Sequence, residues 1–460
     1  MTGSSLPLSA GQEAMWFLHR LAPESAAYNI VLGVRVHSAL DEGALRRATA
    51  ELARRHELLR SLYQEEDGRP LRRPAPGLDA PFEVHEATGA SDAELADLAR
   101  AAGARPFRLS EGRPYRVVLL RRGPADAALV VAAHHIAGDA TSQWLMLRDL
   151  LDAYAGFAAG GTGGLPAAEV PYGAHVAEER RLAATPARQR AERYWAALGE
   201  GTVAATLPAD RPRGAAAALR GATHAHRIDP ELAERLPQAA ALARATPFGM
   251  LLGAFQAAVH RSTGLDDFVI GCPASVRMGK GASDMVGYLV NSLALRARFT
   301  PDTTVGEAVS AAHDGLLRGL SHLRHPVPVP QFAMAVTLLA MDRLPVPGLV
   351  GDGNGTDGNS TDGNGTEYAG LRLSLLDLPH MEGQFDFNVE LRSGRTGLTV
   401  VLRYADDLFT EQTVRRFAEV FERMVRAAVE EPDTAVSRVP LVSTEDLADL
   451  LSLGAGSDDW

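Results

Sequence analysis

The sequence HHIAGDA, residues 134–140, stands directly after an apolar run, residues 128–133, whose composition predicts a buried strand. Two adjacent histidines are seldom placed at the end of a strand for packing alone. Asp139 follows the second histidine by four residues, so a tight loop would bring an imidazole and a carboxylate close together. A positioned imidazole can handle the proton of an attacking nucleophile. The segment therefore predicts acyl-transfer chemistry, whereas a lone histidine at a strand end would favour a structural role.

Composition restricts the class of protein. The chain has 460 residues, of which 46% are hydrophobic and 22% charged, as is usual for a globular protein large enough for two cores. Its net charge of -11 argues against a nucleic-acid partner, because phosphate binding requires a basic surface. Cys272 is the single cysteine, which excludes an internal disulfide and a cysteine-based metal site, and we expect no metal. No apolar stretch is long enough for a membrane span, and residues 1–7 lack the features of a signal peptide, so we expect a cytoplasmic protein.

The order of predicted elements indicates two α+β halves of similar size. Ser9 and Gln12 form a capping-box pattern that starts the first helix. In the first half we expect helices at 9–21, 41–60, from about 141 and at 172–198, strands at 28–36, 115–120 and 128–133, and a connector at 155–168. In the second half we expect strands at 223–228, 267–272, 287–299 and 385–391, and helices at 247–263 and 410–429. The change between the halves lies somewhere in residues 170–200.

Residues 351–370 are rich in Gly, Asn and Asp and repeat a short motif three times. Such a segment cannot bury a core, so it predicts a flexible surface loop. A calcium-binding loop is the less favoured alternative, because the spacing fits no EF-hand and lacks the closing glutamate.

Within the opening segment, Gly138 allows a tight backbone path and a close approach of substrate. A buried carboxylate at Asp139 needs a cationic partner, and arginine is the natural one.

Several motifs in order along the chain resemble those of the condensation domains of nonribosomal peptide synthetases. Residues 134–140 resemble the family's HHxxxDG motif. Further matches are residues 8–12 with 16–18 and 27–30 (first motif), 55–61 (RHExLRT), Tyr172 (fourth motif), 194–195 with 207–212, 286–292 through Arg296 (GxFVNT), and faintly 325–328. The resemblance covers nearly the whole chain.

The resemblance implies a fold class, α+β, with two chloramphenicol-acetyltransferase-like lobes that form a V-shaped pseudo-dimer around a central tunnel. Residues 1–180 would form the N-terminal lobe and residues 181–440 the C-terminal lobe, with the flexible loop 351–370 inside it. Residues 441–460 resemble the linker that leads to an adenylation domain. The chain would then be either an excised domain or a free-standing enzyme.

The resemblance also implies a function. The enzyme would form an amide bond between a donor thioester on an upstream peptidyl carrier protein and an aminoacyl acceptor on a downstream one. Phosphopantetheine arms of these carrier proteins would deliver both substrates, the chain itself would bind no cofactor, and an adenylation domain would adjoin it. Two alternatives remain open, namely a weakly active or inactive docking platform for carrier proteins and an ester-forming enzyme.

Roles for single residues follow from the same resemblance. His135 matches the catalytic histidine, which accepts or orients a proton of the acceptor amine. His134, Gly138 and Asp139 would support it, with Asp139 in a structural ion pair. The expected partners of Asp139 are Arg277 first and Arg60 second. The expected catalytic and supporting residues are thus His134, His135, Gly138, Asp139, Arg277 and Arg60.

For two residues expected in the tunnel, Asn291 and Ala140, the sequence leaves the role undecided. Asn291 is either a hydrogen-bonding group of the tunnel or a structural asparagine at a strand end. Ala140 stands where the family has its final glycine, so its methyl group would cost energy if φ were positive and would narrow the tunnel if it pointed inward. Heterocyclisation domains and oxygenase-recruiting domains are discounted, because both histidines of the motif are present.

Overall fold

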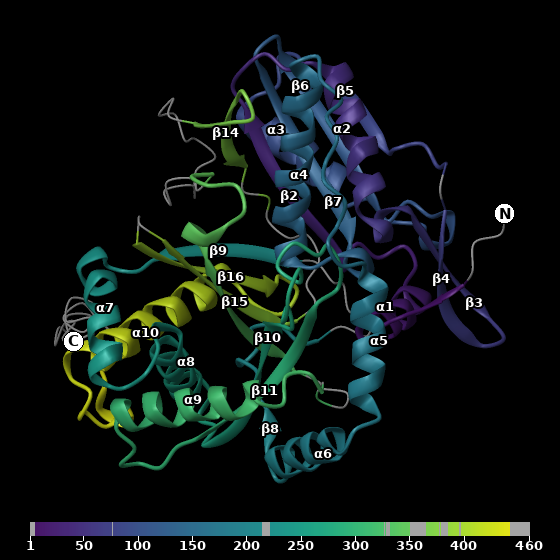
Figure 1. Cartoon of the computed structure of the whole chain (residues 1–460). Coiled ribbons are helices and arrows are strands. Elements are labelled where there is room, and N and C mark those ends of the chain that lie inside the picture. The colour runs from purple at the N-terminus through teal and green to yellow at the C-terminus, as the bar shows by residue number, and fades with distance from the viewer. Residues whose placement is uncertain are drawn as a thin grey trace.

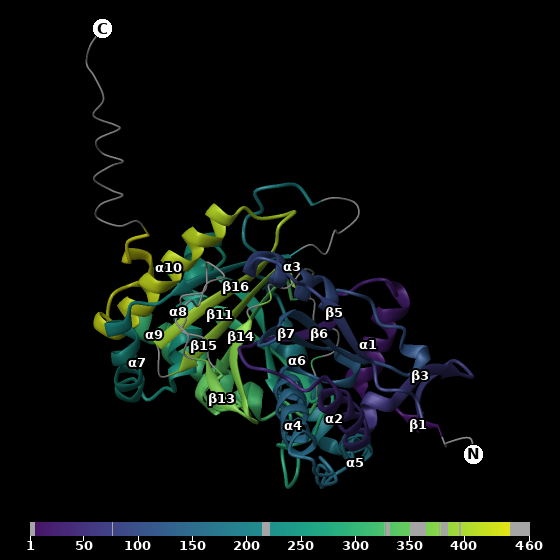
Figure 2. The ribbon, with the colours of Figure 1, turned by 90° about the horizontal axis from the view of Figure 1, so that it is seen from above.

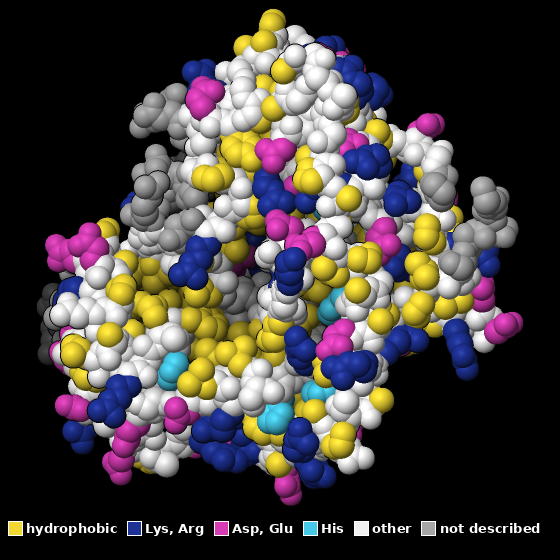
Figure 3. Space-filling view, viewed as in Figure 1, with side chains coloured by type: hydrophobic (Ala, Val, Ile, Leu, Met, Phe, Trp, Pro, Cys, Tyr) yellow, Lys and Arg dark blue, Asp and Glu magenta, His cyan; other side chains and the backbone are white. Residues whose placement is uncertain are grey.

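The computed structural model describes residues 5–75, 77–213, 221–325, 327, 332–349, 365–376, 378, 385–394 and 397–441. Figure 1 shows two lobes, each built on a β-sheet with helices packed against it, and in the view from above they lie side by side (Figure 2). The surface seen in Figure 3 is hollowed where the two lobes meet, and hydrophobic side chains gather beside the hollow on the lower lobe.

The first lobe is built on a six-stranded sheet with the order β13-β14-β2-β7-β6-β5. Its strands are β2 (Asn29–Val36), β5 (Phe82–Glu86), β6 (Tyr115–Gly123), β7 (Asp126–His134), β13 (Thr366–Tyr368) and β14 (Leu371–Leu376). Its helices are α2 (Glu42–Arg55), α3 (Asp92–Gly103) and α4 (Ala140–Ala158). Alternate residues of β7 pack on opposite faces, Leu129 in the cluster with α2 and α4, and Val130 in the cluster with α3. Burial on both faces explains why β7 is apolar without alternation.

A small sheet and two helices flank this lobe. The sheet has the order β1-β4-β3, with β1 (Leu6–Pro7), β3 (Ser61–Glu66) and β4 (Arg69–Pro74). The helices are α1 (Ala10–Leu21), which begins with the predicted capping box of Ser9 and Gln12, and α5 (Tyr172–Ala183).

The second lobe is built on a seven-stranded sheet with the order β11-β10-β12-β15-β16-β9, in which β8 also pairs with β10. Its strands are β8 (Val203–Ala204), β9 (Gly221–Arg227), β10 (Asp267–Ser275), β11 (Val290–Arg298), β12 (Met334–Ala340), β15 (Phe387–Gly394) and β16 (Gly397–Ala405). Its helices are α6 (Pro186–Gly199), α7 (Pro230–Leu242), α8 (Pro247–Thr263), α9 (Val305–Leu320) and α10 (Glu411–Glu430). Short 3-10 helices η1 to η5 lie at Glu57–Arg60, Leu109–Glu111, His135–Ala137, Met341–Arg343 and Val436–Arg438.

One segment of the second half of the chain crosses to the first lobe. Strand β14 pairs antiparallel with β2, with Leu373 opposite Val36. The division of the chain near residue 180 therefore stays our proposal for the domain boundary, with residues 366–376 contributing to the sheet of the N-terminal lobe.

Four sequence predictions need correction at their boundaries. The helix predicted at 41–60 ends at Arg55, because His56 takes an extended backbone and its ring turns inward to Asp149. The helix predicted at 172–198 is two helices, α5 and α6, separated at residues 184–185, and α4 continues to Ala158, into the predicted connector. The predicted loop at 351–370 is wrong for residues 366–368, which form β13, and residues 350–364 lie outside the described part.

Two further predictions concern segments that the structure does not describe. The linker predicted at 441–460 is described only at Leu441, and the faint sixth motif only in part.

Within the described ranges, no helix has both the length and the apolar character to cross a membrane. The same ranges contain no cluster of three potential metal-ligating side chains. The cytoplasmic location stays a prediction.

Candidate active site

The HHxxxD segment forms the connection between β7 and α4. His134 is the last residue of β7, residues His135–Ala137 form a 3-10 turn, and Asp139 is the N-cap of α4. This path turns the chain sharply from the sheet into the helix, beside α1 and the second lobe.

His134 is a structural element of this turn. Its Nδ1 accepts a hydrogen bond from the backbone N–H of Ile136 at 3.1 Å, and its ring packs edge-on against the rings of His19 and Phe107. Burial lowers the pKa of His134 to about 3, and His19 and His135 act in the same direction. The imidazole therefore stays neutral and holds the shape of the loop.

His135 lies beside it with a different environment. Its Nδ1 is 2.7 Å from the carbonyl oxygen of Gly138. Since a carbonyl only accepts, Nδ1 carries the proton and Nε2 keeps its lone pair. Burial lowers the pKa of His135, while the charge of Asp139 acts the opposite way. A neutral, partly exposed imidazole with Nε2 as the acceptor is the form that can take a proton.

The two small residues of the motif have different reasons to be small. Gly138 has φ −170° and ψ 172°, an extended backbone that any residue adopts, so its dihedral angles do not require glycine. A Cβ atom there would lie 3.1 Å from the Cβ of Ser142, so space favours glycine instead. Ala140 is the first residue of α4 and is exposed. Its helical backbone accommodates the methyl group without strain.

Asp139 connects the two lobes. Arg277, which follows β10, donates to its carboxylate from Nη1 at 2.6 Å and from Nη2 at 2.7 Å, and the Asp139 side chain is fully buried. The backbone N–H of Leu289 adds a bond at 3.0 Å from the same second lobe. Burial alone raises the pKa of Asp139, but Arg277 outweighs it and holds that pKa below its usual range. Arg60, the second expected partner, forms no ion pair with Asp139.

Ser142 belongs to the same junction, and the sequence reading missed it. Its backbone N–H and its hydroxyl both lie 2.8 Å from Asp139 Oδ1, and its hydroxyl oxygen accepts from the N–H of Gly287 at 3.0 Å and from Arg277 at 2.8 Å. Aspartate is a preferred N-cap residue, which predicts a bond from Asp139 to the backbone N–H of residue 142 but gives no signal for the role of the Ser142 hydroxyl. Ser142 therefore helps to join α4 to the second lobe.

Helix α1 holds the other side of the turn between β7 and α4. The Gln12 side chain donates from Nε2 to the carbonyl oxygen of Ile136 at 2.8 Å, while its Oε1 accepts from the N–H of Ser9. The Tyr172 hydroxyl donates to the carbonyl oxygen of Tyr288 at 3.0 Å and lies 3.0 Å from the Ser9 hydroxyl. The first and fourth motifs therefore support the geometry of the turn.

A cavity of about 190 Å³ lies next to this turn, between α1, α5 and the segment that leads into β11. Tyr288 lines it and makes an edge contact with the His135 ring, with ring centroids 5.2 Å apart. Gly11 leaves room for that ring, because a Cβ there would lie 2.2 Å from Tyr288 Cε1. Asn291 also lines the cavity and donates to the carbonyl oxygen of Leu323 at 2.8 Å, whereas Ala140 does not line it. Sequence reasoning missed Tyr288, since it occupies a variable position of its motif.

Known proteins resemble this chain in sequence. Residues 3–451 match the family model described as Condensation domain. The chain is 32% identical, over 97% of its length, to CymA, a probable nonribosomal peptide synthetase of Salinispora arenicola. It is 29% identical, over 98% of its length, to phosphinothricin tripeptide synthetase PhsC of Streptomyces viridochromogenes. The chain spans only 6% and 41% of these two relatives.

Solved structures share the fold. The X-domain from teicoplanin biosynthesis has a TM-score of 0.83 at 22% identity, covering 96% of this chain and 99% of that one. The first condensation domain of the CDA synthetase has a TM-score of 0.74 at 21% identity, covering 96% and 100%. The likeness confirms the predicted fold class, α+β with two chloramphenicol-acetyltransferase-like lobes.

Proposed function

Because the chain belongs to the condensation domain family, whose members are acyltransferases that form amide bonds in nonribosomal peptide synthesis, we propose that His135 is its catalytic residue. The substrates in this proposal are a donor acyl or peptidyl thioester and an acceptor aminoacyl thioester. Each is carried on the phosphopantetheine arm of a peptidyl carrier protein, the donor on the upstream one and the acceptor on the downstream one. An adjacent adenylation domain would supply the acceptor.

The hydrogen bond from His135 Nδ1 to Gly138 O carries this proposal. It leaves Nε2 to accept a hydrogen bond from the acceptor amine as the amine nitrogen attacks the donor carbonyl carbon. The C–N bond forms, the C–S bond breaks, and the thiol leaves with the proton that the amine has lost. A thioester is already activated, so orientation of the amine supplies much of the rate.

The remaining site residues position His135 in this mechanism. His134 shapes the turn from within the core, and Gly138 supplies the carbonyl that sets the tautomer. The Asp139–Arg277 pair holds the start of α4 against the second lobe, so its role is structural. Tyr288 and Asn291 line the neighbouring cavity, where we place part of the acceptor.

The test compares the wild-type chain with His135→Ala, using a panel of N-acyl donor thioesters and aminoacyl or hydroxyacyl acceptor thioesters. We expect His135→Ala to lower the single-turnover rate by about 10²- to 10⁴-fold with unchanged thermal unfolding. His85→Ala, which removes an exposed histidine of the same lobe, is the matched control and should keep full activity.

Other outcomes would overturn parts of the proposal. Undiminished turnover of His135→Ala removes the catalytic role. Preference for hydroxyacyl acceptors makes the enzyme ester-forming. Binding of carrier proteins without product across the whole panel makes the chain a docking platform.

A further inference from the structure

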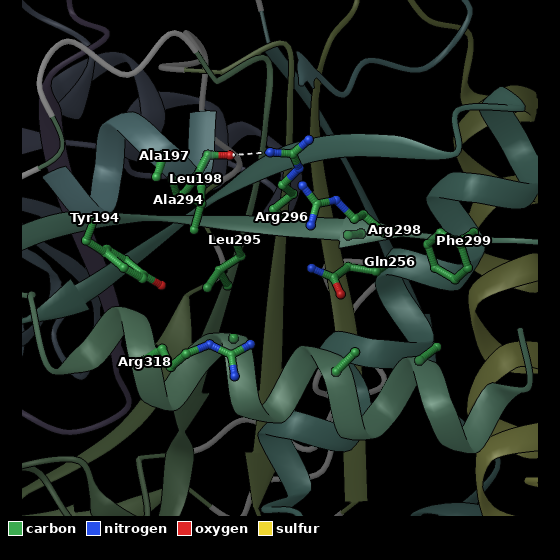
Figure 4. A pocket seen from close by; sticks show the side chains of 14 residues that line it. Tyr194, Ala197, Leu198, Gln256, Ala294, Leu295, Arg296, Arg298, Phe299 and Arg318 are labelled. Atoms are coloured by element: carbon green, nitrogen blue, oxygen red, sulfur yellow. Dashed lines mark hydrogen bonds between the residues drawn. The ribbon is translucent and has the colours of Figure 1, made fainter. Parts of the chain in front are cut away.

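A second and larger cavity lies in the C-terminal lobe, apart from the catalytic turn. Its volume is about 370 Å³, and it lies between the edge strand β11, helix α9 and the end of α6, with α8 at its floor (Figure 4). This volume is within the range of about 300–1,000 Å³ that is usual for small-molecule sites. The cavity shares β11 with the catalytic region, since Asn291 lines the other cavity.

Most of the lining is apolar, and none of it is acidic. The apolar residues come from α6, β11 and α9, and are Ala197, Leu198, Ala294, Leu295, Ala297, Phe299, Ala308 and Ala311. The charged lining residues are three arginines, Arg296, Arg298 and Arg318. An apolar interior with positive charge at its edge favours a ligand with an apolar body and an anionic group.

Gln256 is the polar group at the floor. It projects from α8 into the space between β11 and α9 (Figure 4), and only 3% of its surface is exposed. Its side-chain amide forms no hydrogen bond with any described residue. The amide opens onto the cavity, so a ligand atom that pairs with it takes the place of water there. A site for a polar ligand atom explains why a glutamine stands among alanines here.

Arg318 supplies the charge. Its side chain lies alongside α9 at the lining of the cavity, and the hydroxyl of Tyr194 points into the same space (Figure 4). Within the described ranges no carboxylate lies within 4 Å of its guanidinium, whereas Arg296 makes a two-pronged pair with Asp267 at 2.5 and 2.6 Å. Burial raises the pKa of Tyr194, so its hydroxyl stays protonated and can donate. Arg318 is thus free to pair with an anion from outside.

We propose that this cavity binds a small carboxylate with an apolar chain. The planar guanidinium of Arg318 matches a carboxylate in a two-pronged geometry. The Gln256 amide and the Tyr194 hydroxyl add donors, and the alanine-lined surface takes the chain. The inference does not rest on the proposed reaction, because no catalytic residue lines this cavity.

The test uses the full chain and three eight-carbon probes, octanoate, octanol and octylammonium, measured by calorimetry and by thermal shift. We expect octanoate to bind at least about tenfold more tightly than octanol, and octylammonium not to bind. Arg318→Gln should weaken octanoate about tenfold. Ala311→Phe, a change at an exposed lining position, should abolish binding by filling the cavity.

Arg416→Gln is the matched control, since Arg416 is exposed on α10 of the same lobe. It should leave octanoate binding unchanged, and unchanged circular dichroism of each variant establishes that it is folded. Equal affinity for octanoate and octanol, or octanoate binding that survives both Arg318→Gln and Ala311→Phe, would overturn the proposal.

Discussion

The two lobes contain the same local unit with different surroundings. In the first lobe, the hairpin β6–β7 leads through residues 135–139 into α4, and in the second, the hairpin β15–β16 leads through residues 406–410 into α10, five residues in each loop. Asp139 and Thr410 are the two N-caps. The first cap is fully buried and bound by Arg277 of the other lobe, while the second is bound by the exposed Asp210 of its own lobe.

The difference shows how one of the two loops acquires surroundings that suit the proposed catalytic role of His135. Both loops satisfy the first N–H groups of a helix, which is a local requirement. The first loop faces the other lobe, which supplies Arg277, Leu289 and Tyr288 to its surroundings. Burial between lobes lowers the pKa of His135 and keeps its imidazole neutral. If the two loops differ as much in energy as they do in surroundings, equivalent substitutions in them should have very unequal effects.

The largest expected effect comes from Asp139→Ala. It leaves the guanidinium of Arg277 buried without its carboxylate, and we expect a loss of about 3–5 kcal/mol in the free energy of unfolding. Because the folded-state pKa of Asp139 is lowered, its contribution is present above its ordinary pKa of 3.8 and is lost as pH falls below that value. Urea unfolding at pH 7 measures the loss.

A double variant distinguishes the cost of an unpaired buried charge from a general disruption of the fold. Asp139→Leu combined with Arg277→Met removes both charges, and we expect it to recover at least half of that stability. A loss for Asp139→Ala no greater than that for Thr410→Ala would contradict the contrast between the two caps.

Ser142→Ala should have the next largest effect. The hydroxyl serves Asp139, Arg277 and the N–H of Gly287, so its removal leaves buried groups without partners. We expect a loss of about 1–3 kcal/mol in the free energy of unfolding. Ser310→Ala on α9, where the hydroxyl is exposed and bonds only within its own helix, is the matched control and should change stability little. Equal losses of unfolding free energy for the two serine variants would contradict the inference that Ser142 joins α4 to the second lobe.

The pH dependence of the reaction tests the role of His135 without a substitution. In the proposed mechanism activity requires the neutral imidazole, and burial lowers its pKa below the ordinary value of 6.5. The acceptor amine must also be neutral and has an ordinary pKa of about 8, so kcat/KM is divided by the neutral fraction of the amine, measured by titration of the acceptor alone. We expect this corrected kcat/KM to stay nearly constant from pH 8 down through 6.5 and to fall only at lower pH, and half-loss of the corrected value above pH 6.5 would contradict the predicted environment.

The sequence predicted the parts of this molecule that depend on local pattern. The helices predicted at 247–263 and 410–429 and the tight loop after residues 128–133 follow from residues close together in the chain, and the structure has α8, α10 and the turn after β7 at these places. The pairing of Asp139 with Arg277 spans 138 positions, and local reasoning left two arginines as candidates. The pairing of β14 with β2 and the cavity around Gln256 likewise depend on packing between distant segments. Such contacts leave no periodic signal in the sequence.

The smallest effect is expected at the second cap. Thr410→Ala removes a side chain that accepts from the N–H of Thr413 at 3.3 Å, but Asp210 still accepts from the N–H of Thr410 at 2.7 Å and from the Thr413 hydroxyl at 2.8 Å. Two of the bonds at this helix start therefore survive, and we expect a loss of about 1 kcal/mol or less in the free energy of unfolding. The rate of product formation should be unchanged, because the bonds of Thr410 join it to Asp210 and Thr413 of its own lobe and not to His135 or Asp139. Urea unfolding and the single-turnover assay, run beside Asp139→Ala, measure both. A reduced rate with intact stability would mean that the second loop also takes part in the reaction.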